Sequence, residues 1–412
     1  MVYVIPQENV FNVNIKPKYV KESRENILNS LKFFVICSQF LGILPVENIT
    51  VPNKLRFRWK SWKVLYTLLF IGMTSFASTL CLLDWFYAGY VFNSLGITIF
   101  YSSALVTLIL YVDLARSWPK LMTLWCRIDK IMNNSYGYPK SLNRRFYIVS
   151  ITYSILALGH FLINTVYKSL SIKESTGNEY NFNKYYFKSF PQMFRFIPFS
   201  AVSATFCFIV HIHGFLTWLT NDLFIILISI ALALRFKQIS ERLVRNQRTF
   251  QNKSLHFWKE IREDYDRLSL LCKELDKHLS YMILLSFSMN IFFLLVKLYN
   301  SLEGFADVSG QVYFVYSFMY LIIKIVSVSL YAAWINDESV GPASILNSVP
   351  ASSYNIEIRR LLTQISFDNV ALTGCRMFKV TRGIILSIAG AVVTYELVLI
   401  QFNAATGLNT TE

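Results

Sequence analysis

The chain has 412 residues, of which 54% are hydrophobic, 16% aromatic and 16% charged. Soluble proteins carry about 25% charged residues, so this chain lacks the polar side chains that would cover a water-facing globule. A soluble enzyme, a secreted domain and a nucleic-acid-binding protein all fit poorly, and we interpret the chain as an integral membrane protein. Its six cysteines have no CxxC or CxxH spacing, so neither a disulfide framework nor a zinc site is indicated.

Residues 1–63 come first and contain no signal-peptide core. Seven apolar runs follow, each close to the 20 or so residues that a helix needs to cross the hydrocarbon layer. They cover residues 64–83, 95–114, 146–166, 197–219, 281–302, 312–335 and 383–402. The predicted fold is therefore all-α, with seven transmembrane helices, and an odd number of spans places the two termini on opposite sides of the membrane.

The positive charges between these runs predict the orientation. Segments 1–63, 115–145, 235–280 and 336–382 hold ten, seven, eleven and five Lys or Arg, whereas the intervening segments hold five in 167–196 and none elsewhere. Loops rich in Lys and Arg stay in the cytoplasm. We therefore expect a cytoplasmic N-terminus and an extracellular C-terminus, which is opposite to a G-protein-coupled receptor. The excess of Lys and Arg over Asp and Glu then reflects membrane topology and does not indicate nucleic-acid binding.

The longer connections carry patterns of their own. Residues 167–196 are rich in Tyr, Asn and Lys and suit either an outer lid or an ordinary solvated loop. Residues 222–250 continue the fourth run as a helix, and residues 255–279 repeat apolar side chains at helical spacing, which predicts one buried stripe. These inner helices could form a cytoplasmic platform where subunits meet, or the second could lie on the membrane surface. The pair His211 and His213 points in two directions along one helix, so a structural role is favoured over a metal site.

The seventh run has a stripe of small and polar residues. Successive steps of three and four residues meet Gly383, Ser387, Gly390, Thr394, Leu397 and Gln401. A stripe of this kind should face protein or water, because small residues allow close helix packing and polar groups tolerate a wet pore. Pore lining and dimer packing both remain open at this point, although packing explains Thr394 and Gln401 less well.

Three more residues of this run are candidates for the pore. Tyr395 and Phe402 form the neighbouring stripe, and a ring of Phe402 with Gln401 beside it would make an apolar gate. Glu396 is ionisable at membrane depth, where it could attract cations or pair with Lys297 or Lys324 of other spans. One seven-helix chain has no obvious conduit, so a pore would require several copies around an axis.

Residues 394–402, TYELVLIQF, are similar to the T-Y-(five residues)-Q-F signature in the last helix of insect gustatory receptors. Glu396 directly after the Tyr resembles the form found in the sugar-receptor branch. Further blocks, NDLFIILISIALALRFKQ at 221–238, FWKEIREDYDRLSLLCKELD at 257–276, SLYAAWINDES at 329–339 and ALTGCRMFKVTRGIILSIAG at 371–390, are similar to the same branch. The resemblance covers most of residues 197–402 and is weaker before them, where SQFLGILPV at 38–46 matches best.

This resemblance implies a tetrameric, ligand-gated cation channel in the dendritic plasma membrane of gustatory neurons. The chain would then comprise a cytoplasmic segment (1–63), a six-helix ligand-binding bundle (64–335) with cytoplasmic extensions (222–280), an anchor segment (336–382), a pore helix (383–402) and an extracellular tail (403–412). Gln401 and Phe402 are implied as gate residues, and Thr394 and Tyr395 as pore-helix residues. The expected partners are a mono- or disaccharide, the bilayer, identical or related subunits, and permeant Na⁺ and K⁺, with Ca²⁺ left open.

A sugar needs hydrogen-bonding groups beside aromatic rings. Residues of these types in the outer halves of the spans are Asp84, Trp85, Tyr101, Ser102, His160, Asn164, Asn290, Tyr313, Tyr316, Tyr320 and Lys324. Aromatic residues also gather at membrane interfaces whatever the function, so each has a structural alternative. No cofactor, metal or enzymatic motif is indicated. The alternatives to a sugar-gated channel are a subunit that needs a partner or senses another ligand, and a non-conducting metabotropic receptor. Asn409-Thr410-Thr411 is an N-x-S/T string on the expected outer side, but it lies so close to the last span that its glycosylation is left open.

Overall fold

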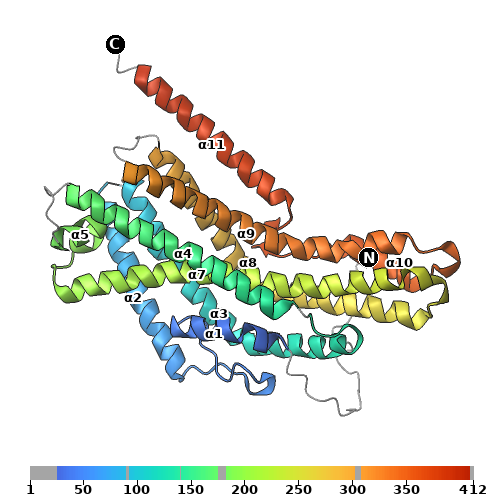
Figure 1. The fold of residues 1–412 in the computed structure, drawn as a ribbon. Helices are drawn as coiled ribbons and strands as arrows, with labels where there is room; N and C mark the ends of the chain where they lie inside the picture. The colour runs from blue at the N-terminus through green and yellow to red at the C-terminus, as the bar shows by residue number, and fades with distance from the viewer. Residues whose placement is uncertain (1–25, 90–91, 140, 175–181, 302–307, 409–412) are drawn as a thin grey trace, which may run out of the picture.

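The computed structural model describes residues 26–89, 92–139, 141–174, 182–301 and 308–408, and within them the chain is almost wholly helical (Figure 1). The helices are α1 (Ile27–Phe40), α2 (Trp62–Tyr87), α3 (Phe92–Tyr136), α4 (Leu142–Glu174), α5 (Phe182–Ser189), α6 (Pro191–Phe194), α7 (Ala201–Asn246), α8 (Leu255–Ser301), α9 (Val308–Asn347), α10 (Ile356–Asp368) and α11 (Gly383–Leu408). Short 3₁₀ turns cover Pro52–Lys54 (η1), Gln247–Asn252 (η2) and Ala351–Ser353 (η3), and β1 (Thr373–Gly374) pairs antiparallel with β2 (Phe378–Lys379). Asn409 and the first 25 residues of the N-terminal segment lie outside the described residues.

Six of these helices, α2, α3, α4, α7, α8 and α9, are long and apolar enough to cross a membrane. The seventh expected span is α11, which has 26 residues and is therefore about 39 Å long. Every apolar run found in the sequence is thus helical, which confirms the all-α, seven-helix fold class.

Four helices are much longer than a membrane span. Helices α3, α7, α8 and α9 have 45, 46, 47 and 40 residues, hence lengths of about 60–70 Å, twice the thickness of the hydrocarbon layer. They run together from the end of the bundle that carries α5 to the end that carries α10 (Figure 1). We call these the α5 end and the α10 end. The expected helical extensions of 222–280 are present as the α10-end halves of α7 and α8.

Helix α7 is the central helix of the bundle. It begins at a capping box between Ser200 and Ser203, and every residue from 223 to 236 is buried. The sequence there, LFIILISIALALRF, is apolar on all sides, as a helix surrounded by protein requires. The one charge, Arg235, is paired with Asp129 of α3 at 2.7 Å, and both side chains are 3% exposed.

The stripe predicted for α8 faces the core of the protein. Its members are at most 1% exposed apart from Leu255, which lies at the helix start and is 56% exposed; they are Trp258, Ile261, Tyr265, Leu268, Cys272, Leu275 and Leu279. Helix α8 continues without a break from this half into its apolar span, so the stripe belongs to one long helix and not to a separate amphipathic helix.

Helix α1 and the turn after it reach between the membrane spans. His213 of α7 donates from Nε2 to the carbonyl oxygen of Leu41 (2.8 Å), and its ring stacks on Phe70 of α2 at 4.0 Å. Gly42 has a φ of +69°, and a Cβ there would lie 2.9 Å from Phe70. His213 therefore has the structural role expected for it. Residues 27–46, which we expected within a cytoplasmic segment, contact α2 and α7.

A short hairpin connects the α10 end to α11. Asp276 of α8 accepts hydrogen bonds from the backbone N–H and the hydroxyl of Thr373 in β1, both at 2.7 Å. Arg382, just before α11, pairs with Asp337 of α9 at 2.7 Å. Beyond this anchorage α11 leaves the bundle (Figure 1), and none of its residues from 383 to 398 is buried.

Candidate functional site

A buried charged cluster lies where α4, α7, α8 and α9 meet. The ammonium of Lys324 pairs with Asp222 Oδ2 at 3.0 Å, and the two side chains are 1% and 0% exposed. Asp222 also accepts hydrogen bonds from Ser286 Oγ (2.5 Å), Asn290 Nδ2 (3.2 Å) and Tyr153 OH (3.2 Å). Two expected ligand residues, Asn290 and Lys324, thus bind Asp222. The partner of Lys324 in the chain is Asp222, so the pairing with Glu396 considered above is not the one observed.

Trp218 joins this cluster to the rest of the site. Lys324 Nζ lies 3.3 Å from the centre of the Trp218 ring, a cation–π contact, and the ring also meets Phe293 at 5.2 Å. Trp218 is one helical turn from Asp222 on α7, so both groups hold the Lys324 side chain from the same helix.

Aromatic stacks continue from this cluster along α4 and α9 toward the α5 end. His160 stacks on Tyr320 at 4.5 Å and 15°, and Tyr167 stacks on Tyr313 at 4.6 Å and 10°. Lys297 of α8 places its ammonium 3.9 Å from the Tyr313 ring centre. His160, Tyr313 and Tyr320, three of the candidate ligand residues, thus lie in these stacks, and the ammonium of Lys297 lies beside Tyr313.

Two further candidates lie on the same pair of helices. The hydroxyl of Tyr316 on α9 donates to the carbonyl oxygen of Leu156 at 3.2 Å and so ties α9 to α4. Asn164 is half-buried on α4, one turn beyond His160.

The remaining expected ligand residues form a separate group between α2, α3 and α7. Tyr101 is fully buried, with its hydroxyl 3.4 Å from His211 Nδ1, and Ser102 bonds to Ser78 at 2.9 Å. Asp84 pairs with Arg195 at 2.8 Å, while the neighbouring Trp85 ring contacts Phe86 at 6.0 Å. These contacts are between protein groups, and they divide the expected pocket into two parts.

A small cavity between α3, α7 and α8 separates the two parts. Its lining residues are Phe100, Ser103, Ala104, Thr107, Gly214, Trp218, Asn221, Leu285, Ser286 and Met289. A water-sized sphere has about 10 Å³ to move in, which is room for roughly one water molecule.

Four residues of this site were not predicted from the sequence: Trp218, Asn221, Asp222 and Ser286. One signal could have found them: Asp222 is a lone acid next to the long apolar run of α7. An ionisable residue at such a position is a functional candidate by default, together with its neighbours.

Helix α11 presents the expected pore residues to its surroundings. Thr394, Glu396, Leu397 and Gln401 are exposed and Tyr395 is half-buried. The backbone of Phe402 lies within α11, and its side chain is outside the described residues. The small and polar stripe on this helix therefore has no partner among the described residues of the chain.

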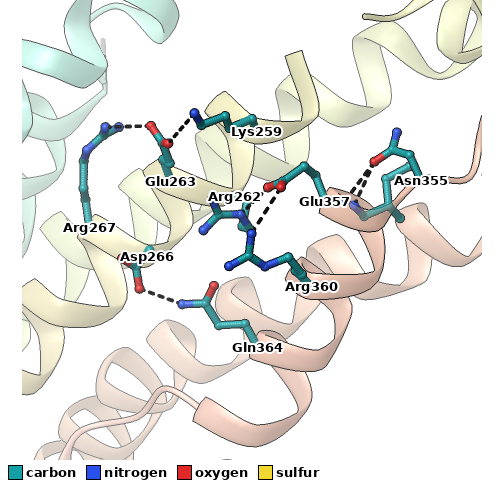
Figure 2. Close-up of polar contacts among 10 residues, drawn as sticks. Lys259, Arg262, Glu263, Asp266, Arg267, Asn355, Glu357, Arg360 and Gln364 are labelled. Atoms are coloured by element: carbon teal, nitrogen blue, oxygen red, sulfur yellow. Dashed lines mark hydrogen bonds and ion pairs between the residues drawn. The ribbon is translucent and has the colours of Figure 1, made fainter. Parts of the chain in front are cut away.

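At the α10 end, ion pairs hold α10 against α8 (Figure 2). Arg262 pairs with Glu357 at 2.5 Å, and Gln364 donates to Asp266 at 2.8 Å. The hydrogen bond from Arg262 holds the pKa of the Glu357 carboxyl below its ordinary value. Asn355 caps α10 by accepting from the backbone N–H of Glu357 (3.0 Å).

The family model described as trehalose receptor matches residues 12–410. The Drosophila melanogaster gustatory receptor for sugar taste 64f is 31% identical over 412 aligned residues, covering 96% of this chain and 86% of that protein. Gustatory receptor 5a for trehalose, from the same fly, is 27% identical and covers 94% of this chain and 89% of that protein. The olfactory receptor OR5 from Machilis hrabei in complex with eugenol has a TM-score of 0.68 and 16% identity, covering 91% of this chain and 98% of that one.

Fold and comparison together define a multi-pass helical membrane protein with the fold of the olfactory receptor OR5 from Machilis hrabei. Within that class, the chain belongs to the trehalose receptor family, the sugar-taste branch of the insect gustatory receptors.

Proposed function

We propose that this protein is a taste receptor that opens a non-selective cation pore when a sugar binds. Its relatives are named for sugar taste and, in one case, for trehalose, which supports a mono- or disaccharide as the ligand. In this proposal the α10 end is cytoplasmic, because segments 115–145, 235–280 and 336–382, which are rich in Lys and Arg, lie there. The receptor then works in the plasma membrane of gustatory neurons, at their dendrites, and passes Na⁺ and K⁺.

The exposed helix α11 is the observation that carries the channel proposal. A helix with no buried residue from 383 to 398, and with Thr394 and Gln401 exposed on one stripe, is incomplete in a single chain. Several copies around an axis would bring these stripes together and enclose a polar path. Four copies, identical or mixed with related subunits, follow the plan of the family. Gln401 and Phe402 then form the gate, and Glu396 lies close enough on the same helix to attract cations.

The sugar is proposed to bind in the α5-end half of the bundle, beside the His160–Tyr320 and Tyr167–Tyr313 stacks. Flat aromatic faces suit the apolar face of a pyranose ring, and Lys297 supplies a donor to hydroxyl groups. Asn164 and Tyr316 lie on the same two helices.

The proposal is tested by whole-cell current in cells that express this chain alone, with a panel of mono- and disaccharides. A sugar-evoked cation current is expected, and Gln401→Ala and Phe402→Ala should change its gating. Thr205→Val on α7, far from α11 in the chain and exposed, serves as the control for substitution itself.

Each other outcome has a definite meaning. If the receptor reaches the cell surface but gives no response, it requires a partner subunit or senses a ligand other than sugar. A sugar response that neither α11 substitution alters would remove α11 from the pore and refute the mechanism. A response that depends on cellular G proteins and persists without a conductance of its own would favour a metabotropic receptor.

A further inference from the structure

The cavity between α3, α7 and α8 contains two polar atoms without partners. Trp218 Nε1 and Asn221 Oδ1 are both buried and meet no hydrogen-bond partner among the described residues. Asn221 is 2% exposed; its amide nitrogen donates one of its two hydrogens to the carbonyl oxygen of Met282 (3.2 Å), whereas its oxygen has no partner among the described residues. Both residues line the cavity.

Each of the three hydroxyl groups that line the same cavity already donates its hydrogen to another protein atom. Ser103 donates to Phe100 O (2.9 Å), Thr107 to Ser103 O (2.8 Å) and Ser286 to Asp222 Oδ1 (2.5 Å). A hydroxyl has one donor and two acceptor lone pairs, so each oxygen can still accept. Within the described part of the chain, the cavity lining therefore has one wholly unpartnered N–H donor, that of Trp218, and several acceptors.

These donors and acceptors determine which chemical group can occupy the cavity. The occupant must accept from Trp218 Nε1 and donate to Asn221 Oδ1, which a hydroxyl group or a water molecule does and a carboxylate or an ammonium does not. A cation is disfavoured further, because the ammonium of Lys324 lies 3.3 Å from the Trp218 ring centre. The room for about one water molecule fits a single hydroxyl-sized group.

We propose that this cavity is a binding site for one hydroxyl, that of a bound water or of the sugar itself, held between Trp218 Nε1 and Asn221 Oδ1. Its occupant sets the position of the Trp218 ring, whose face carries Lys324 and through it the Asp222 cluster. Where the hydroxyl belongs to the sugar, the inference rests on the proposed function and makes this cavity the subsite that recognises one particular hydroxyl.

The experiment combines high-resolution cryo-electron microscopy maps of the full-length protein, with and without sugar, with dose–response curves. The variants are Trp218→Phe, which keeps the ring for Lys324 but removes the N–H, and Asn221→Leu, which removes the acceptor at similar size. Thr205→Val is the matched control, because its hydroxyl bonds to Ala201 O within α7 and is exposed. The ligands are the parent sugar and its series of monodeoxy analogues.

Two results support the proposal and distinguish the sources. Density in the cavity without sugar, together with an equal loss of response to all sugars in both variants, identifies a bound water. A half-maximal concentration that rises about tenfold or more in the variants for the parent sugar, but not for one monodeoxy analogue, identifies the hydroxyl missing from that analogue as the occupant.

The inference would be overturned by an empty cavity in both maps together with unchanged variants. Unchanged means a half-maximal sugar concentration within about twofold of wild type and an unfolding temperature within about one degree of it, on the order of experimental scatter. Failure of the proposed function is recognised separately: if wild type gives no sugar current, the map without sugar still shows whether the cavity is occupied.

Discussion

Asp222 and Lys324 are costly residues to bury, because both charges are withdrawn from water. Such a pair gains little over apolar residues of the same shape, but the loss of one partner costs about 3–5 kcal/mol, since it leaves the other charge buried alone. The cluster is therefore expected to matter more for one specific arrangement of α4, α7, α8 and α9 than for net stability.

Asp222→Asn and Lys324→Met are each expected to destabilise the purified protein by about 3–5 kcal/mol. The double variant Asp222→Leu with Lys324→Met should lower the free energy of unfolding by less than either single change, because it leaves no unpaired buried charge. Thermal unfolding in detergent measures this, with Lys32→Met on the exposed face of α1 as the control. A double variant less stable than both single variants would show that the pair itself contributes net stability.

The ionisation of Glu260 makes the stability of the fold at the α10 end depend on pH. Arg242 donates to its carboxylate at 2.9 Å and thereby lowers the pKa of Glu260 below its ordinary value. A lowered carboxyl pKa stabilises the fold above the unfolded value of about 4.3, and this contribution is lost as the pH falls through the folded value.

Glu260→Gln should therefore reduce the stability at pH 7 by up to about 1 kcal/mol, the scale of a partly exposed pair. The difference from wild type should shrink as the pH falls below the unfolded value, and it should vanish once the pH is below the lowered folded pKa of Glu260, where the wild-type carboxyl is also protonated. Unfolding temperatures measured across this pH range test the effect. A constant difference at every pH would mean that Glu260 acts by packing and not by charge.

Among the elements, the turn after α1 depends on one glycine. Gly42 has a left-handed φ of +69°, and a Cβ there would lie 2.9 Å from the Phe70 ring. Gly42→Ala is expected to cost about 1–3 kcal/mol in stability, since alanine is strained in this conformation and the ring must shift.

The matched control is Gly72→Ala in α2, where a Cβ meets nothing within 4 Å. Alanine favours the helix over glycine, so this change should be neutral or stabilising in thermal unfolding. Equal effects of the two substitutions would contradict the role of the turn.

The hairpin before α11 is the second element with a testable role. Asp276 holds Thr373 by two hydrogen bonds, and this fixes where α11 leaves the bundle. Asp276→Ala removes hydrogen bonding worth about 1–3 kcal/mol. It is therefore expected to lower the current at saturating sugar several-fold, whereas the affinity for sugar should not change.

Current per molecule at the cell surface, measured beside sugar binding to purified protein, separates the two effects. Glu274→Ala is the control, because its exposed side chain pairs only with Lys277 among the described residues. Weaker sugar binding in the Asp276 variant would instead place the hairpin in the ligand pathway.

At the scale of the whole molecule, α10 leaves an apolar surface uncovered. Phe367 is 84% exposed and Ile356 is 57% exposed, and both line a groove on α10 with Arg359 and Thr363. In the proposed assembly this face lies in the cytoplasmic anchor, where neighbouring chains would cover it.

Phe367→Glu is therefore expected to shift the purified receptor from oligomer to monomer, because a charge is costly inside an apolar contact. Phe367→Leu keeps the apolar character and should leave the assembly intact. Native mass spectrometry or cross-linking in mild detergent measures the result. An unchanged oligomer in Phe367→Glu would show that subunits meet elsewhere.

The sequence by itself determined the seven helices, the long α7 and α8 extensions and the unusual stripe on α11, because hydropathy and periodicity are local properties of the chain. Its orientation in the membrane, argued from Lys and Arg, stays a prediction. Only the tertiary structure decided which polar residues could meet a ligand. Asp84 binds Arg195, Tyr316 binds Leu156, and Lys324 binds Asp222. Those partners are far apart in sequence, and whether a buried polar group is already satisfied depends on the packing of helices, which no local pattern encodes.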